Sequence, residues 1–234
     1  GRGRLVNLFD AVKDAMLVLV GWIFVVAPLG VFALAVSVGI KAGLGAFGLL
    51  GHYIAVLVSV QVGLIILIYL LAVVLGRVGP LTFARAVLPA QTMAVSTQSS
   101  IASLPAIYAG AERLGLPEAT TRVVLPLAVS IFRITSPCAN IAVVLYCGHL
   151  YGMEHTALAY LGALLAALVA AVSTGGLPGS ITFLAATVPI ANAMGVPIAV
   201  LPVLLAVELV PDVFRTLGNV TADLAVTAIL SRKR

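Results

Sequence analysis

The last apolar segment of the chain carries charged and polar side chains at regular intervals. In "VELVPDVFRTLGNVTADLAVTAIL" they recur at i, i+4, i+7, i+11 and i+15, a spacing that places them on one face of a helix. The five residues are Glu208, Asp212, Arg215, Asn219 and Asp223. A carboxylate and a guanidinium three residues apart can bind the two ends of a zwitterion, and a carboxylate with an amide offers the oxygen ligands that small cations prefer. The spacing therefore predicts a binding site for a small charged solute and a cation.

The simplest alternative is that Asp212 and Arg215 pair only to make a buried polar face tolerable. Thr216 and Thr221 extend the same polar face, and ion pairing alone does not explain them. We therefore favour the binding site.

Another charge lies in an otherwise apolar stretch, "SIFRITSPCAN" (Ser130 to Asn140). It is Arg133, four residues before the helix-breaking Pro137. Charges at membrane depth are costly, so they face a cavity or a partner and are functional hypotheses by default. Arg133 therefore joins the candidate functional residues.

The composition indicates the surroundings of these residues. Hydrophobic residues make up 62% of the chain and charged residues 9%, and the mean hydropathy is +1.21. A soluble domain of this composition would lack the polar surface that water requires. Apolar runs of the roughly 20 residues that a bilayer core demands occur from Ala15–Ile40 onward. We predict an all-α, polytopic membrane protein.

The net charge of +5 does not indicate a nucleic-acid partner, because the basic residues are scattered near segment ends. In membrane proteins such residues accumulate in cytoplasmic loops. With four spanning segments, ten basic residues share one side and Lys41 alone faces the other. The ten are Arg2, Arg4, Lys13, Arg77, Arg85, Arg113, Arg122, Arg232, Lys233 and Arg234. The count predicts a multi-pass protein of the inner or plasma membrane with a cytoplasmic C-terminus.

Spanning helices are predicted at about 5–40, with a kink at Pro28, and at about 52–76. Beyond residue 79 the apolar stretches are short, and they are interrupted by small polar residues, glycine and proline. The interruptions are "STQSSIASLP", "FRITSP" and "STGGLPGS", at residues 96–105, 132–137 and 173–180. Broken backbone is tolerated at membrane depth only where protein buries it or a cavity wets it. These segments therefore predict a site.

Two of the interruptions resemble each other, since "SSIASLP" and "STGGLP" both place small polar residues before Leu-Pro. Matched interrupted segments are typical of re-entrant hairpins in transporters with inverted repeats. We therefore divide the chain into 1–78, with two spanning helices, and 79–234, the core of a transport domain. The elements predicted in that core are hairpin 1 at about 80–110, a broken helix at 119–148, hairpin 2 at about 157–195 and the last helix at 198–230.

Two other classes of protein fit less well. An intramembrane hydrolase needs a nucleophile and a base at depth, but His52, His149 and His155 fall at segment ends and no Ser-His or Ser-Lys pair is available at depth. A channel is expected to show a repeated filter or rings of charge rather than a paired clamp. An anion channel and a non-transporting fragment remain as alternatives to a carrier, and no enzymatic activity is predicted.

The final helix closely resembles that of the glutamate transporter family, the dicarboxylate/amino acid:cation symporters. "VPDVFRTLGNVTADLAVTAI" matches the family pattern Asp-x-x-Arg-Thr-x-x-Asn-Val-x-x-Asp, and "SSIASLP" and "STGGLPG" are similar to the tips of its two hairpins. The chain would correspond to family helices five to eight with both hairpins. The resemblance implies a homotrimer whose mobile transport domains carry a small anionic substrate by an elevator motion. It implies sodium or a proton as coupling ion and no other cofactor.

The resemblance also implies roles for individual residues. The substrate-binding set would be Ser99, Ser100, Ser136, Gly176, Leu177, Asp212, Arg215, Thr216 and Asn219. The cation-binding set would be Ser130, Thr174, Asn219 and Asp223, with sodium at Asp223 and Asn219. Within these sets Asp212 would bind the substrate amino group and Arg215 its side-chain carboxylate.

One segment departs from the family pattern. Where the family has Asn-Met-Asp-Gly-Thr, this chain has Phe132-Arg133-Ile134-Thr135-Ser136. Ile134 has no oxygen to replace the aspartate that helps to bind sodium, and Arg133 stands where the family has methionine. We therefore expect altered cation coupling in a symporter of acidic amino acids or C4-dicarboxylates, and a proton-coupled or sodium-independent carrier is the alternative.

Three hypotheses for Arg133 follow. Its guanidinium replaces a sodium ion and pairs with Asp223 or Glu208, or it binds a substrate carboxylate directly, or it is only a structural partner that extends into the cavity. In the first hypothesis the Arg133 guanidinium takes the place of the coupling cation, and Glu208 is one of its two candidate partners.

Overall fold

A computed structural model describes residues 45–175 and 179–232, together with separate positions between residues 6 and 40. The helix predicted at about 5–40, with its kink at Pro28, falls largely outside the described residues. The regular structure of the described part is helical. Its elements are α2 (Gly45–Val74), α3 (Pro80–Thr97), α4 (Leu104–Arg113), α5 (Glu118–Ile131), α6 (Thr135–Leu150), α7 (Ala157–Ser173), α8 (Gly179–Met194), a 3₁₀ turn (Ile198–Val200), α9 (Leu201–Leu205) and α10 (Leu209–Ser231).

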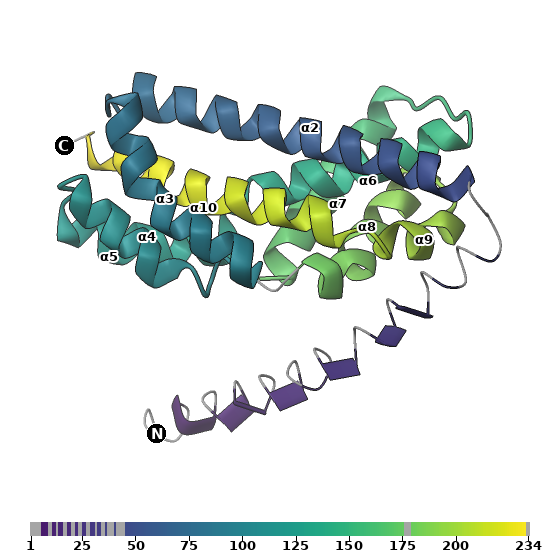
Figure 1. The fold of residues 1–234 in the computed structure, drawn as a ribbon, viewed down its shortest axis with the longest axis horizontal. Coiled ribbons are helices and arrows are strands. Elements are labelled where there is room, and N and C mark those ends of the chain that lie inside the picture. The colour runs from purple at the N-terminus through teal and green to yellow at the C-terminus, as the bar shows by residue number, and fades with distance from the viewer. Residues whose placement is uncertain are drawn as a thin grey trace.

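Helices α2 and α10 run side by side along the bundle, with α3 to α5 packed at one end and α6 to α9 at the other (Figure 1). Each end has its own apolar core. Phe83, Ile107 and Leu224 are among the buried residues of the first, and Leu57 and Phe183 are among those of the second. Val220, Leu224 and Ala228 of α10 belong to the first core, whereas the buried polar residues Asp212, Arg215 and Asn219 lie in the part of α10 that precedes them.

Helix α2 begins seven residues earlier than predicted, at Gly45 rather than about residue 52. The added residues include Gly45, Gly48 and Gly51, and glycine disfavours helix in water by about 1 kcal/mol per residue. In an apolar environment an unpaired backbone group costs several kcal/mol, so the helix continues through these glycines.

The segment after residue 197 is not the single helix predicted at 198–230. A 3₁₀ turn and α9 are followed by a turn at residues 206–208, and α10 starts only at Leu209. Pro211 explains the break, since its ring would collide with the carbonyl of residue 207 and it has no N–H to donate. Pro137 acts in the same way on residue 133, and residues 132–134 separate α5 from α6.

The same order of elements occurs twice in the described chain. Two helices, α3 and α4, precede the broken pair α5 and α6, and α7 and α8 precede the broken pair α9 and α10. Both α3 and α4, and α7 and α8, pack against each other. At Gly110 in α4 the approach is close enough that a Cβ atom would lie 2.6 Å from the Ala86 carbonyl oxygen of α3.

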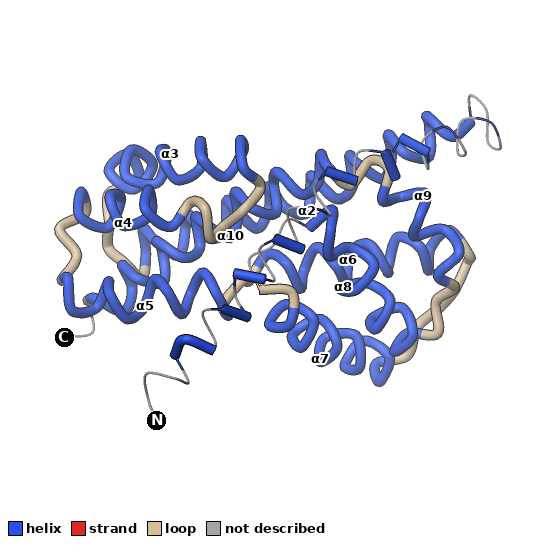
Figure 2. The backbone as a smooth tube through the Cα atoms, turned by 90° about the horizontal axis from the view of Figure 1, so that it is seen from below, coloured by secondary structure: helices blue, strands red, loops and turns tan. Residues whose placement is uncertain are grey.

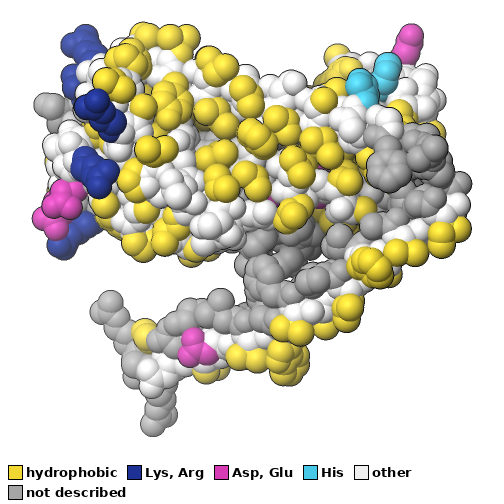
Figure 3. All heavy atoms as spheres, viewed as in Figure 1, with side chains coloured by type: hydrophobic (Ala, Val, Ile, Leu, Met, Phe, Trp, Pro, Cys, Tyr) yellow, Lys and Arg dark blue, Asp and Glu magenta, His cyan; other side chains and the backbone are white. Residues whose placement is uncertain are grey.

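The outer surface has the pattern of a membrane protein. Hydrophobic side chains cover the middle of the bundle, whereas the described arginine side chains gather at one end and histidine lies near the other (Figure 3). Three helical stretches of the described residues are long and apolar enough to cross a membrane, Gly48–Val74, Glu118–Leu150 and Leu209–Ser231. The side of the membrane that the basic end faces stays a prediction.

Candidate functional site

Three interruptions of the chain meet the first half of α10. The Thr216 hydroxyl oxygen lies 3.4 Å from the carbonyl oxygen of Gln98, in the α3–α4 connection that Figure 2 shows beside α10. The backbone N–H of Thr135, at the start of α6, donates to Asn219 Oδ1 over 3.1 Å. The N–H of Gly179, at the start of α8, donates to Asp212. The polar face of α10 is thus lined by broken backbone from three directions.

The centre of this site is a buried cluster of charges around Arg215. Its guanidinium donates to Glu208 Oε1 at 2.5 Å and to Asp212 Oδ1 at 3.3 Å. The Tyr53 hydroxyl of α2 donates to the other Glu208 oxygen at 2.6 Å. All four side chains are at most 3% exposed. Buried charges are tolerated only when they are paired and hydrogen-bonded, and this network satisfies both conditions for Glu208.

Asp212 also binds the beginning of α8. Its Oδ2 accepts the Gly179 N–H at 2.8 Å, so a carboxylate occupies the positive end of that helix. Glycine is required here, because a Cβ at residue 179 would overlap both the Asp212 carboxylate and the Arg215 guanidinium. The charge cluster and the start of α8 are therefore coupled.

Replacement of Gly179 by alanine tests this coupling. The added Cβ must push the start of α8 away from Asp212, so we expect Gly179→Ala to destabilise the protein by about 1–3 kcal/mol. Thermal unfolding in detergent measures the effect. Gly162→Ala is the matched control, since a Cβ on α7 there meets Ala193 at an ordinary 3.6 Å. Equal unfolding temperatures for Gly179→Ala and the wild type would contradict the coupling.

Asn219 joins α10 to the start of α6. Its Oδ1 accepts from the Thr135 N–H, and its Nδ2 donates to the Ser136 hydroxyl at 3.0 Å. The Thr135 hydroxyl lies 2.7 Å from both Asn219 Oδ1 and the Arg215 carbonyl oxygen and donates to one of them. Because both Oδ1 and Nδ2 take part in these bonds, the Asn219 side chain links α10 to α6 and is only partly available to a cation.

Some polar atoms of Asp223 and Arg133 have no hydrogen-bond partner among the described residues. Asp223 is fully buried, and within the described residues both its carboxylate oxygens are without a hydrogen-bond partner. Arg133 is 6% exposed, its nearest described partner is the Thr174 hydroxyl at 3.4 Å, and its Nε–H has none. The two charges interact electrostatically, although no ion pair within 4.0 Å joins them. A buried carboxylate without a partner is costly, and a bound cation or protonation removes that cost.

The contacts of Glu208 bear on the hypothesis that it pairs with Arg133. A pair between Arg133 and Glu208 was one candidate, but both Glu208 oxygens are used by Arg215 and Tyr53. Among the described residues, Arg133 and Glu208 form no ion pair. Tyr53 was not predicted as a site residue, because it lies in an apolar run, and only its contact with a residue 155 positions away reveals it.

The remaining predicted site residues differ in their burial and in their hydrogen-bond partners. In the α3–α4 connection, Ser99 is half-buried and Ser100 is buried with no described partner for its hydroxyl. Thr174, at the end of α7, is buried and donates to the Ala170 carbonyl. Ser130 is exposed near the end of α5, so a role in cation binding would rest on its backbone carbonyl. Gly176 and Leu177 lie outside the described residues.

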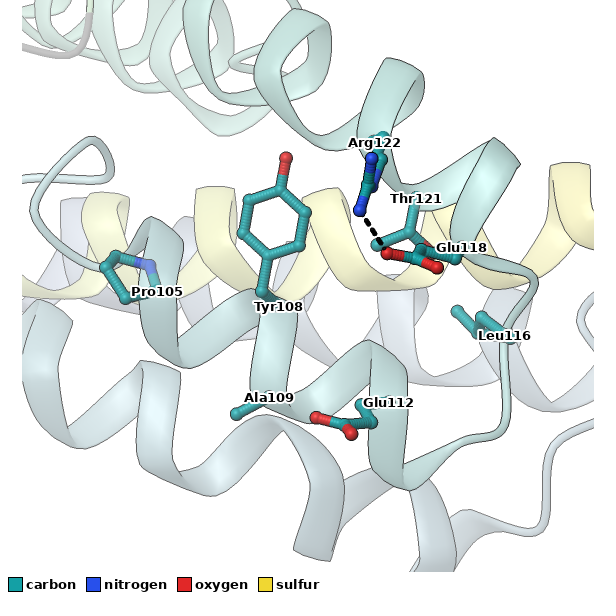
Figure 4. A pocket seen from close by; sticks show the side chains of 8 residues that line it. All are labelled: Pro105, Tyr108, Ala109, Glu112, Leu116, Glu118, Thr121 and Arg122. Atoms are coloured by element: carbon teal, nitrogen blue, oxygen red, sulfur yellow. Dashed lines mark hydrogen bonds and ion pairs between the residues drawn. The ribbon is translucent and has the colours of Figure 1, made fainter.

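A cavity of about 580 Å³ lies elsewhere, between α4 and α5 near the basic end (Figure 4). Tyr108 and Arg122 face this space, and Arg122 is paired with Glu118 on its own helix. Glu112 adds a second carboxylate to the lining, which disfavours an anionic solute. None of the predicted substrate residues lines this cavity.

A buried charge cluster at the meeting point of broken helices, inside an apolar bundle, is typical of a membrane transport protein. A model of the sodium:dicarboxylate symporter family matches residues 2–233. The chain therefore belongs to that family, which confirms the resemblance of its last helix.

The chain is also similar to individual transporters. It is 28% identical over 232 residues to the putative sodium-dependent excitatory amino acid transporter glt-4 of Caenorhabditis elegans, covering 97% of this chain and 46% of that protein. It is 26% identical over 233 residues to the proton/sodium-glutamate symport protein of Bacillus subtilis, with 99% and 54% covered. An L-cystine uptake protein of Bacillus thuringiensis is 26% identical, with 97% and 49% covered. The chain spans about half the length of the curated relatives it matches.

Proposed function

We propose that this chain is the substrate-carrying part of a secondary active symporter for acidic amino acids or C4-dicarboxylates. The observation that carries the proposal is Arg215, a buried guanidinium beside Asp212 where three chain interruptions meet. A guanidinium binds a carboxylate in a bidentate fork, and a carboxylate one turn away binds an ammonium group. Relatives named as glutamate symport proteins support the same substrate class.

A substrate can enter the charge cluster by exchange of partners. Arg215 holds Glu208 at 2.5 Å but Asp212 only at 3.3 Å, and its Nε–H has no described partner. A substrate carboxylate would bind the free Nε–H and replace Asp212 on the guanidinium. Asp212 would then be available for the substrate amino group, with Thr216, Ser136 and the serines of the α3–α4 connection around it.

The wider architecture belongs to the same proposal. The repeated order of two helices and a broken helix supports two re-entrant hairpins in an inverted repeat, with residues 79–234 as the moving domain. An elevator motion, a homotrimer and a cytoplasmic C-terminus follow from the family resemblance and the charge count.

We propose that Arg133 changes the cation coupling of this transporter. It is a fixed positive charge in the interior, and the buried Asp223 carboxylate has no other described cation near it. Arg133 would serve Asp223 as a built-in counter-ion, so that transport needs fewer sodium ions or none. Proton coupling through Asp223 is the second candidate, because a proton also neutralises a bare buried carboxylate.

Uptake into proteoliposomes tests both parts of the proposal. We expect saturable uptake of labelled aspartate, succinate or malate, with each of these competing, and retention of uptake when choline replaces sodium. Absence of saturable uptake for all three and for cystine would reject the carrier. Saturable uptake that vanishes in choline would leave the carrier in place and reject sodium-independent transport.

A further inference from the structure

The end of α2 carries an arginine in a conformation that suits glycine. Arg77 has a φ of +49°, in the left-handed region, and the Val78 N–H that follows it donates back to the Ala72 carbonyl oxygen, six residues earlier. Glycine is the usual residue at such a position because it has no Cβ to strain. An arginine in this conformation carries a cost in backbone free energy, so its side chain is a candidate for a role that offsets this cost.

Arg77 lines a cavity of about 530 Å³ with one other arginine. The lining residues are Leu75 and Arg77 at the end of α2, and Ile229 and Arg232 at the end of α10. The two helix ends lie side by side at the basic end of the bundle (Figures 1 and 3). In the described part of the chain neither guanidinium has an ion pair, whereas Arg122 at the same end is bound to Glu118. The cavity therefore combines two unpaired cations with two apolar walls.

We propose that Arg77 and Arg232 bind the phosphate headgroup of an anionic phospholipid. Guanidinium groups bind phosphate in bidentate fashion, and basic pockets at the ends of spanning helices lie at headgroup depth. The partly exposed Leu75 and Ile229 would contact the first methylene groups of the acyl chains. These apolar walls favour a lipid over free phosphate, which would use the same arginines only. This site shares no residue with the proposed substrate site and does not rest on transport.

Lipid retention in the purified protein tests the site. The protein in neutral detergent is titrated with phosphatidylglycerol, with phosphatidylcholine and, in a separate arm, with inorganic phosphate, and bound lipid is counted by native mass spectrometry alongside thermal unfolding. We expect phosphatidylglycerol alone to be retained and to raise the unfolding temperature. Arg77→Gly and Arg232→Gln should each weaken binding about fivefold. Arg77→Gly should unfold at the wild-type temperature or above in the absence of lipid, because glycine relieves the backbone.

Arg122→Gln is the matched control, since it removes a charge from the same end without touching the cavity. Wild-type affinity in this variant supports a defined site. An equal loss in Arg122→Gln and Arg77→Gly would overturn the proposal in favour of diffuse surface charge. Equal retention of phosphatidylcholine, or an Arg77-dependent effect of inorganic phosphate as strong as that of the lipid, would overturn it as well. If Arg77→Gly lowers the unfolding temperature without lipid and leaves lipid retention unchanged, Arg77 only complements the α2 dipole and the proposal fails.

Discussion

Replacement of Arg215 by lysine is expected to reduce uptake of every dicarboxylate and acidic amino acid at least about a hundredfold. A lysine keeps the positive charge that Glu208 requires, so the buried ion pair can persist. It cannot hold Glu208 and a substrate carboxylate at once, because an ammonium lacks the planar fork of a guanidinium. Loss of a bidentate, charge-assisted contact to substrate is worth about 3 kcal/mol, which corresponds to this factor. Initial rates of labelled aspartate and succinate uptake into proteoliposomes measure it.

Two controls separate binding from folding in that experiment. Arg122→Lys makes the same substitution at an exposed ion pair with Glu118 and should transport as the wild type does. Thermal unfolding of Arg215→Lys should show that the variant is folded. Near-wild-type uptake by a folded Arg215→Lys protein would show that this guanidinium does not bind the substrate.

The polar face of α10 was predictable because helical period alone brings together residues that share a face. Asp212, Arg215 and Asn219 all follow that period and are all buried in the structure. The break before α6 was predictable for a similarly local reason, since Pro137 interrupts the helix from a known distance. These predictions depend on neighbours within about four turns of one helix.

The partners of those residues could not be predicted in the same way. Tyr53 binds Glu208 from α2, and Gly179 binds Asp212 from α8, through packing between segments far apart in the chain. Tyr53 follows His52 at the start of a long apolar run, and no local pattern marks it as a site residue. The turn at residues 206–208 had a local cause in Pro211, but the long apolar segment favoured one continuous helix. Local rules identified the polar groups, and tertiary contacts determined their pairing.

The coupling role of Arg133 predicts a specific double-mutant result. Arg133→Met removes the counter-charge of the buried Asp223 carboxylate, and Asp223→Asn removes one of the two carboxylates, Asp212 and Asp223, that attract the buried Arg133 guanidinium. We expect Arg133→Met to lose about 3 kcal/mol of stability and Asp223→Asn to lose less, since Asp212 still compensates the guanidinium. The double variant should recover at least about 1 kcal/mol relative to the sum of the single losses. Thermal unfolding of all four proteins measures this coupling.

Transport by the same variants separates the hypotheses for Arg133. If the guanidinium replaces a cation, Arg133→Met should lose most of its uptake in choline and regain part of it in sodium, because sodium can then occupy the place near Asp223. If Arg133 instead binds a substrate carboxylate, sodium should not restore uptake, and the loss should be larger for succinate than for substrates with one free carboxylate. Strictly additive stability effects with unchanged uptake would leave Arg133 as a structural partner of Thr174. The coupling hypothesis therefore requires both the energetic coupling to Asp223 and the new dependence on sodium.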